Sequence, residues 1–456
     1  MKWPLLALIG LLAPLAGAGA SRTFPQVDVS RAPGTQAEVS IVADPGHPTV
    51  LLAGSNSDPV SARVLMRVYT STDGGNTWGS QPGPLPPGGS DGDCTFSDPA
   101  VGIDLHSREY YAYLYAPCDA IRELPNLAVA TRIGARGAWR MVPVEHRNHF
   151  RIDDKPALAV DTSPQSRFVG RVYLIWIRSG STREPGGVVV SHSQSQGRAW
   201  SRPVVVVGAL GVDPWFPAMA VGARGQLYVA WMADVGTVEI ARSTDGGAHF
   251  GRPQVVDRVI SLPRRPCDHA PALSIPAQPQ RCISPAPSIS IDRTRGPRAG
   301  RVYAVYGKSG RDGREQDVFV HVYDARLRSQ GTFRVNPPDG LRASDQFFPV
   351  SAIDQSNGLL WVCYYNSGTG RARTRATFSC TASADGGEHW SAPVRAASRA
   401  SDTTVPGAPE FEYGDYEGLA VANGVAHPIW TDTRDMRTRG EEIYTTAIPQ
   451  SALQLP

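Results

Sequence analysis

The sequence predicts an all-β protein folded as a β-propeller, a closed ring of four-stranded sheets called blades. Two observations lead to this prediction. The 456 residues include 46 glycines and 39 prolines, and both residue types break helices. In addition, one phrase of residues recurs along the chain at intervals of roughly 57 to 69 residues, the range of propeller blades. We therefore expect seven blades, with six as the alternative.

The recurring phrase consists of a polar residue, often followed by a proline, and then a short apolar run that usually ends near an aspartate. Its seven copies begin near Ala37, Asp98, Asp154, Trp215, Ser284, Gln346 and Tyr416. The third copy divides into four short segments rich in Val, Ile, Tyr and Trp, separated by turn residues: 157–160, 171–178, 187–191 and 203–208. Each copy therefore predicts one four-stranded blade.

The last copy favours a closed ring over a linear solenoid, which is the alternative. After the predicted strands 417–423, 425–432 and 441–448 the sequence ends, which leaves that blade one strand short. The N-terminal segment 26–30 precedes the first copy and is free to supply the missing outer strand. Such a strand would close the ring and complete the last blade.

The N-terminus has the features of a secretory signal peptide. Residues 1–20 contain the basic Lys2, an apolar stretch too short to cross a bilayer and the small-residue ending Ala18-Gly19-Ala20. Residues 21–456 are then a single propeller domain, secreted or periplasmic. A net charge of +3 with scattered arginines argues against nucleic acid as a partner, and no later segment predicts a membrane span.

Six cysteines suit an oxidising compartment. Pairing between neighbours in sequence is the simplest of the 15 possible connectivities. Zinc is the competing interpretation, but Cys-x-x-Cys spacing is absent from the sequence. We expect up to three disulfides, Cys94 with Cys118, Cys267 with Cys282, and Cys363 with Cys380.

A sharper motif lies between the third and fourth predicted strands of several copies. It occurs as Ser71 to Trp78, Ser243 to Phe250 and Ser383 to Trp390, with a degenerate copy at Ser193 to Trp200. These octets resemble the Asp-box, or bacterial neuraminidase repeat, of the sialidase superfamily. Aspartate and glycine suit a tight hairpin turn. We assign a structural role to the aspartates of the motif, Asp73, Asp245 and Asp385.

The residues that lead into each innermost strand should surround one mouth of the central channel, where propellers usually bind ligands. This set is rich in carboxylates, which accept hydrogen bonds from hydroxyl groups, and in aromatic rings, which stack on sugar faces. It includes Asp98, Asp154, Lys155, Trp215, Phe216 and Asp415. The set favours a glycan or glycoconjugate as partner.

The resemblance to sialidases implies a retaining glycoside hydrolase with a tyrosine nucleophile, an activating glutamate, an aspartate acid/base and three carboxylate-binding arginines. The catalytic candidates are Tyr416, Glu417, Glu412, Asp154 and Asp98. The candidates for substrate binding are Arg151, Arg178, Arg434, Trp215, Phe216 and Asp415. The alternative function is a non-catalytic propeller that binds carbohydrate or protein at the same rim. We expect a monomer without a cofactor or metal site.

Overall fold

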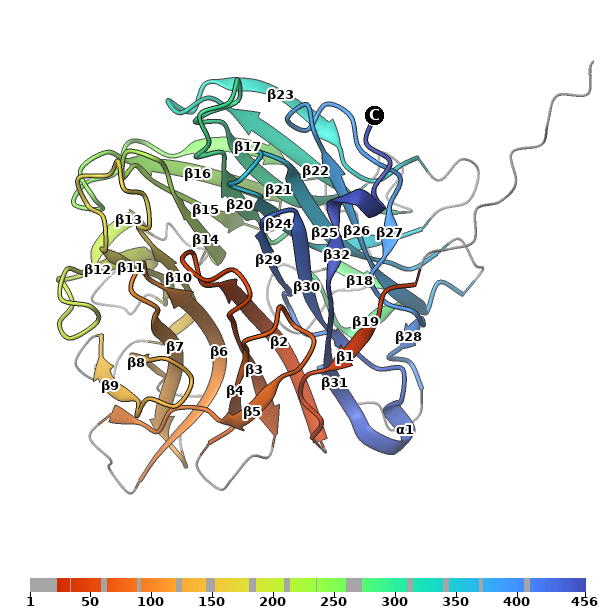
Figure 1. The fold of residues 1–456 in the computed structure, drawn as a ribbon, viewed down its shortest axis with the longest axis horizontal. Coiled ribbons are helices and arrows are strands. Elements are labelled where there is room, and N and C mark those ends of the chain that lie inside the picture. The colour runs from red at the N-terminus through yellow and green to blue at the C-terminus, as the bar shows by residue number, and fades with distance from the viewer. Residues whose placement is uncertain are drawn as a thin grey trace, which may run out of the picture.

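The computed structural model describes most of residues 23–456. Residues outside the description are 1–22, 33, 59–63, 88–91, 120–124, 145–151, 180–185, 209–213, 235, 260–272, 310–314, 339–343, 369–371 and 406–410. The predicted signal peptide, Arg151 and Cys267 lie outside the described residues. The described chain is almost entirely β-structure, as the glycine and proline content predicts, and its sheets form a β-propeller (Figure 1).

The predicted number of blades, seven or alternatively six, is wrong. Within the described residues, five sheets stand as separate blades of four strands, each a sequential antiparallel ladder. The first three comprise β6 (Asp93–Ile103), β7 (Arg108–Pro117), β8 (Asn126–Ile133) and β9 (Arg140–Pro143); β10 (Asp153–Val160), β11 (Val172–Arg178), β12 (Gly187–Ser193) and β13 (Val204–Gly208); and β14 (Trp215–Val221), β15 (Leu227–Asp234), β16 (Thr237–Ser243) and β17 (Gln254–Arg258).

The other two blades follow a short hairpin formed by β18 (Leu273–Ile275) and β19 (Gln278–Ile283). They comprise β20 (Ser288–Ile291), β21 (Val302–Ser309), β22 (Gln316–Tyr323) and β23 (Ser329–Arg334); and β24 (Gln346–Ile353), β25 (Leu360–Asn366), β26 (Arg375–Ser383) and β27 (Val394–Arg395), with β28 (Ser401–Asp402) also paired to β26. In Figure 1 the five blades follow one another around the molecule from β6 in orange to β24 in blue.

The remaining strands, from the two ends of the chain, belong to one nine-stranded sheet. A parallel contact of β2 with β31, at Gly34 opposite Gly440 and Thr35 opposite Glu441, joins the two groups of strands. The repeat count assigns these two groups of strands to two blades, because copies in the sequence do not show where sheets merge. The strands are β1 (Gln26–Asp28), β2 (Gly34–Ala43), β3 (Leu51–Asp58), β4 (Met66–Ser71), β5 (Gly79–Pro82), β29 (Gly418–Ala422), β30 (Val425–Asp432), β31 (Gly440–Thr446) and β32 (Ile448–Pro449).

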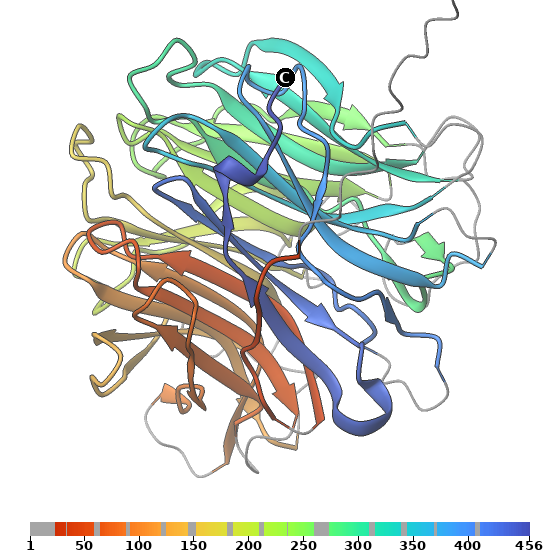
Figure 2. The ribbon, with the colours of Figure 1, turned by 45° about the vertical axis from the view of Figure 1, so that its right-hand side comes forward.

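The two ends of the chain lie side by side in this sheet. Strand β1 pairs antiparallel with β31, with Gln26 opposite Thr446, and Figure 2 shows the red N-terminal strands beside the blue C-terminal strands. The only α-helix in the described chain, α1 (Met436–Arg439), has four residues, and a short 3₁₀ turn follows at Gln450–Ala452. Among the described residues, no helix is long and apolar enough to cross a membrane.

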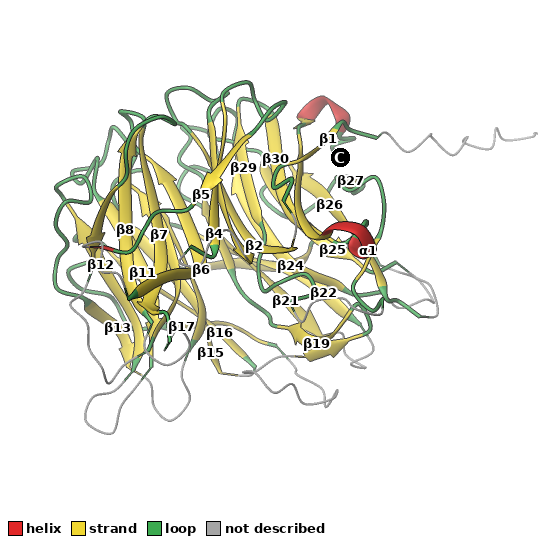
Figure 3. Ribbon diagram, turned by 90° about the horizontal axis from the view of Figure 1, so that it is seen from below, coloured by secondary structure: helices red, strands yellow, loops and turns green. Residues whose placement is uncertain are grey.

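Apolar side chains between neighbouring sheets form the core. One cluster joins Tyr110 and Leu114 of β7 to Leu174 and Trp176 of β11, so adjacent blades bury each other's faces. Four tryptophans are fully buried, and each lies in the second strand of its set: Trp176, Trp231, Trp361 and Trp430. The view from below in Figure 3 shows the strands of neighbouring sheets packed in successive layers.

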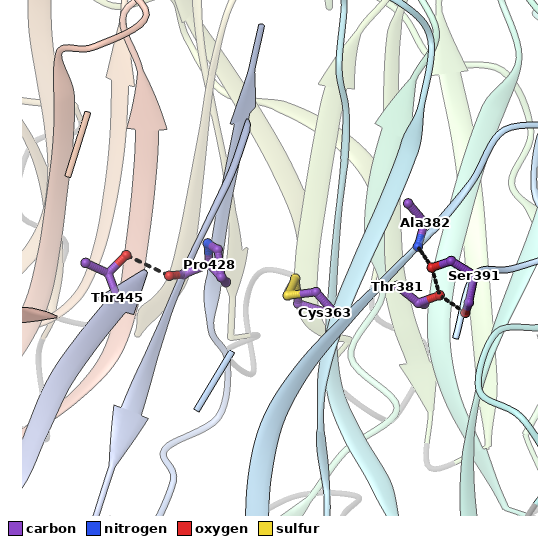
Figure 4. The surroundings of a disulfide bond; sticks show 7 residues. Cys363, Thr381, Ala382, Ser391, Pro428 and Thr445 are labelled. Carbon is purple, nitrogen blue, oxygen red and sulfur yellow. Dashed lines mark hydrogen bonds between the residues drawn. A yellow bond between two sulfur atoms is a disulfide. The ribbon is translucent and has the colours of Figure 1, made fainter. Parts of the chain in front are cut away.

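Two of the predicted disulfides are confirmed. Cys94 bonds to Cys118 and Cys363 bonds to Cys380. The second pair joins directly opposed residues of β25 and β26. Beside it, the Thr381 hydroxyl donates to the Ser391 carbonyl at 2.7 Å, as Figure 4 shows. Cys282 is also disulfide-bonded, and its predicted partner Cys267 lies outside the described residues. These bonds suit an oxidising compartment.

Candidate active site

A repeated backbone irregularity occurs in five strands of the propeller. Strands β2, β6, β10, β14 and β24 each contain a register shift, which marks a bulge. One residue in each bulge has a positive φ of 49° to 57°, although none is glycine: Glu38, Asp98, Lys155, Phe216 and Phe348. Such bulges redirect a side chain away from the regular alternation of the strand. Four of the five residues precede a proline, which has no N–H to lose from the ladder.

Three of these bulge residues meet around one ammonium group. Lys155 Nζ lies 3.3 Å from Asp98 Oδ1 and 3.9 Å from Glu38 Oε1. It also lies 2.9 Å from Oδ2 of Asp415, which precedes β29. The Lys155 side chain is 11% exposed and Glu38 and Asp98 are buried, so these charges interact in a poorly hydrated site. We call Glu38, Asp98, Lys155, Asp415 and Arg281 the channel cluster.

Arg281 comes from outside the bulges, on the β18–β19 hairpin. Its Nε and Nη2 both donate to Asp415 at 2.8 Å, a bidentate pair, and Nη2 also donates to Glu38 Oε1 at 2.5 Å. Glu412 fixes the hairpin by accepting hydrogen bonds from the backbone N–H groups of Gln280 and Arg281. A guanidinium from an inserted hairpin thus ties β2 to the segment before β29.

Asn56 of β3 links the two acidic bulge residues, Glu38 and Asp98. Its Nδ2 donates to Glu38 Oε2 at 2.6 Å, and its Oδ1 accepts the backbone N–H of Asp98 at 3.0 Å. The buried amide therefore fixes one carboxyl group directly and the other through its backbone.

Burial and the neighbouring charges give the carboxyl groups of the cluster different pKa values. Burial raises the pKa of Glu38 to about 8, although Lys155 and Arg281 oppose that rise. Burial raises the pKa of Asp98 to about 6, again against the effect of Lys155. Burial alone would also raise the pKa of Asp415, but Lys155 and Arg281 reverse this effect and hold it far below its usual range. The cluster therefore contains a permanent anion and two carboxyl groups that titrate near neutral pH.

Tyr416, the predicted nucleophile, lies at this cluster. Its hydroxyl donates to Asp98 Oδ1 at 3.1 Å, and burial followed by the nearby carboxylates raises its pKa well above the usual range. Glu417 lies elsewhere in the packing: it accepts hydrogen bonds from the Tyr365 hydroxyl at 2.5 Å and from the Thr431 N–H. The structure therefore brings Tyr416 to Asp98, while Glu412 and Glu417 bond to other groups.

The predicted arginines are bound to carboxylates of their own sheets. Arg178 Nε lies 3.1 Å from Asp153 Oδ1 and is buried. Arg434 pairs with Asp432 at 2.5 Å, and its guanidinium lies 4.1 Å from the Tyr444 ring centroid. Both of these ion pairs are made with residues outside the channel cluster.

The other predicted rim residues lie beside the cluster. The Phe216 ring centroid lies 5.6 Å from Lys155 Nζ, and the Trp215 ring lies 6.2 Å from that of Phe216. Asp154 accepts the backbone N–H of Lys155 at 2.8 Å. Aromatic surface, carboxylates and cations are thus close together here.

The aspartates of the three octets hold their own turns. In the first, Asp73 Oδ1 accepts the Ser71 hydroxyl at 2.8 Å and the Thr77 N–H at 2.9 Å. Asp245 and Asp385 make the same two kinds of hydrogen bond, with the hydroxyl two residues before and the N–H four residues after. Each turn joins a third strand to a fourth, away from the bulge residues.

Sequence reasoning missed Glu38 and Arg281. Glu38 occupies the same bulge position as Asp98 and Lys155, but valine follows it where those residues have proline. An alignment of the copies by this position would have found Glu38. No repeat pattern marks Arg281, because its hairpin is inserted between two blades.

Comparisons with known proteins found no match in sequence families and only distant matches among solved structures. No protein-family model matches the sequence, and no curated protein matches it. Among solved structures, the intramolecular trans-sialidase from Ruminococcus gnavus is 11% identical, with a TM-score of 0.48 over 78% of this chain and 94% of that one. An α-L-arabinanase from Penicillium chrysogenum is 13% identical, with a TM-score of 0.47 over 95% of this chain and 100% of that one.

Proposed function

We propose that this protein is a glycoside hydrolase whose active site is the channel cluster. The observation that carries the proposal is the pair Glu38 and Asp98, two buried carboxyl groups on neighbouring bulges that share Lys155. Because both lie within 4 Å of one Nζ atom, these carboxylate oxygens are at most about 7 Å apart, whereas the carboxyl pairs of glycosidases are separated by about 5 to 9.5 Å.

The different pKa values of the pair assign the roles. Glu38, with its pKa of about 8, is protonated at neutral pH and is the general acid. Asp98, with its pKa of about 6, is mostly ionised and is the general base or nucleophile. In the overall reaction the glycosidic C–O bond breaks, the leaving oxygen takes the proton of Glu38, and water adds to the anomeric carbon. Asp98 accepts the proton of that water.

The remaining residues hold these two carboxyl groups in place. Asp415 balances Lys155 and Arg281 as a permanent anion. Asn56 orients Glu38 and the backbone of Asp98. Phe216 and Trp215 provide aromatic surface next to the charges for the apolar face of a sugar.

A sialidase is the narrower form of this proposal, and the support for it is the Asp-box resemblance. In that form Tyr416 would be the nucleophile, and its hydrogen bond to Asp98 makes Asp98 the base that activates it. That mechanism also needs arginines for the substrate carboxylate, but Arg178 and Arg434 pair with Asp153 and Asp432, and Arg151 lies outside the described residues. A fluorogenic sialoside tests this form directly, with Tyr416→Phe as its variant.

The proposal is tested with purified mature protein and a panel of chromogenic glycosides. For a substrate that is turned over, we expect Glu38→Gln and Asp98→Asn each to lower kcat by about 10²- to 10⁴-fold, the contribution of a positioned acid or base. The control is Asp324→Asn, in an exposed turn where Asp324 pairs only with nearby Arg328 among the described ion pairs. Full activity in both cluster variants would refute the proposal. Glycan binding without turnover would support the non-catalytic alternative.

A further inference from the structure

Resting on the proposed function, we infer that the ligand of the channel cluster is an uncharged, hydroxyl-rich sugar and that carboxylated sugars are excluded. Both cations of the cluster already have carboxylate partners. Lys155 has three N–H donors, and three carboxylates lie within 4 Å of its Nζ: Asp415, Asp98 and Glu38.

Arg281 is engaged in the same way. Its Nε and Nη2 hold Asp415 in a bidentate pair, and Nη2 also holds Glu38. One face of its guanidinium lies 4.6 Å from the ring centroid of Phe411. Nε and both N–H groups of Nη2 are thus engaged, so an incoming carboxylate would have to displace a resident carboxylate to form a bidentate pair with Arg281.

The charge count around the site also opposes an anion. Glu38, Asp98 and Asp415 belong to the cluster, and Asp154 lies against Lys155 and Asp98. With Glu38 protonated, two cations still face three acidic groups. A further anion would add like-charge repulsion in a site with little water to screen it.

A second observation concerns a buried carboxyl group next to the cluster. Glu441 is fully buried, and neither of its carboxylate oxygens makes a well-formed hydrogen bond among the described residues. Its carboxyl group interacts electrostatically with Arg281, Glu412 and Glu38, so it lies next to the cluster. Burial raises the pKa of Glu441 well above its usual range, so it is a neutral carboxyl group that both donates and accepts hydrogen bonds, as a hydroxyl-rich ligand does.

Sugar hydroxyl groups suit these carboxyl groups. Ionised carboxylates only accept hydrogen bonds, so the cluster can bind hydroxyl groups without rearranging its ion pairs. The Phe216 ring beside Lys155 and the neighbouring Trp215 suit the C–H face of a pyranose or furanose ring. The arrangement therefore selects neutral monosaccharide units over sialic or uronic acids.

The test compares neutral and anionic ligands on the same protein. A panel of 4-methylumbelliferyl glycosides of neutral pentoses and hexoses is assayed beside the sialoside and the glucuronide, and the same sugars are measured on a glycan array. We expect at least one neutral sugar to exceed both anionic sugars at least 100-fold in kcat/KM or 10-fold in affinity. A sialoside or glucuronide that equals or exceeds the neutral sugars overturns the inference and leaves the hydrolase proposal standing.

The other outcomes separate the two proposals. Neutral glycan binding without turnover refutes only hydrolysis, whereas neither binding nor turnover of any sugar refutes both.

Asp415→Asn frees donors of Lys155 and Arg281, so we expect it to raise the ratio of anionic to neutral affinity at least 10-fold. Asp98→Asn is the second variant with the same expected direction, because Asp98 also pairs with Lys155, and Asp257→Asn, which removes the partner of Lys308, is the matched control. An unchanged ratio in both cluster variants overturns the inference.

Discussion

Replacing Lys155 with methionine removes the ammonium group that contacts all three carboxylates of the channel cluster. Removing one member of a buried ion pair typically destabilises a protein by about 3–5 kcal/mol, because the partner charge is left uncompensated. Arg281 still contacts Asp415 and Glu38, so the effect falls mainly on Asp98. We therefore expect Lys155→Met to lower the free energy of unfolding by about 3 kcal/mol at pH 8.

The pH dependence of this loss follows from the pKa of Asp98, which is about 6 with Lys155 present. Because Lys155 lowers that pKa, the variant carries a proton on Asp98 to higher pH than the wild type. The folded variant then binds a proton that the unfolded chain lacks, so its stability falls further as the pH rises. Each pH unit above about 6 adds about 1.4 kcal/mol to the deficit, or about 2–3 kcal/mol between pH 6 and pH 8.

Urea unfolding of both proteins at pH 5 and pH 8 measures this effect. The matched control is Lys308→Met, because Lys308 pairs with Asp257 at 2.7 Å while its side chain is 27% exposed. We expect the control to lose about 1 kcal/mol or less and to lose the same amount at both pH values. Equal losses for Lys155→Met at pH 5 and pH 8, or a loss no larger than that of Lys308→Met, would refute the reasoning.

Three further predictions concern other parts of the molecule. The double variant Cys363→Ala/Cys380→Ala opens a 17-residue loop, so under oxidising conditions we expect its free energy of unfolding by denaturant to be about 3 kcal/mol lower than that of the wild type. When both proteins are reduced, we expect their free energies of unfolding to be equal. Asp245→Ala removes the acceptor of the Ser243 hydroxyl and the His249 N–H, and we expect a loss of about 1 kcal/mol with unchanged glycoside kcat; a tenfold fall in kcat would contradict the structural role. Arg281→Met removes a cation that lowers the pKa of Glu38, so the alkaline limb of the pH–rate profile should move above pH 8, and a limb that stays or moves down would count against the assigned acid.

Much of the fold was predictable because the repeat expresses local chemistry. Turn residues and β-branched runs identify the strands of a blade, and neighbouring cysteines identify the disulfides at Cys94–Cys118 and Cys363–Cys380. The blade number was not predictable in this way. Whether two groups of strands form one sheet depends on the contact between Gly34 and Gly440, which lie at opposite ends of the sequence.

The candidate site shows the same contrast between residues marked by a local pattern and residues joined by long-range contacts. Asp98, Asp415 and Tyr416 stand next to predicted innermost strands, and the structure brings them together at Lys155. Arg281 contacts a residue 243 positions away and another 134 positions away, and such contacts leave no local pattern. The pairing of Tyr416 with Asp98 also depends on side-chain directions that spacing does not fix. The sequence therefore indicates which residues precede the innermost strands, whereas the charge arrangement depends on contacts between distant parts of the chain.

The most direct test of the central claim is the pH dependence of kcat/KM on a neutral glycoside, measured for the wild type and for Glu38→Gln. An acid with a pKa of about 8 and a base with a pKa of about 6 predict a bell-shaped profile for the wild type, with activity falling below pH 6 and above pH 8. In Glu38→Gln we expect a large loss of activity and no alkaline limb. A wild-type profile without these limbs, or an unchanged alkaline limb in Glu38→Gln, would contradict the account.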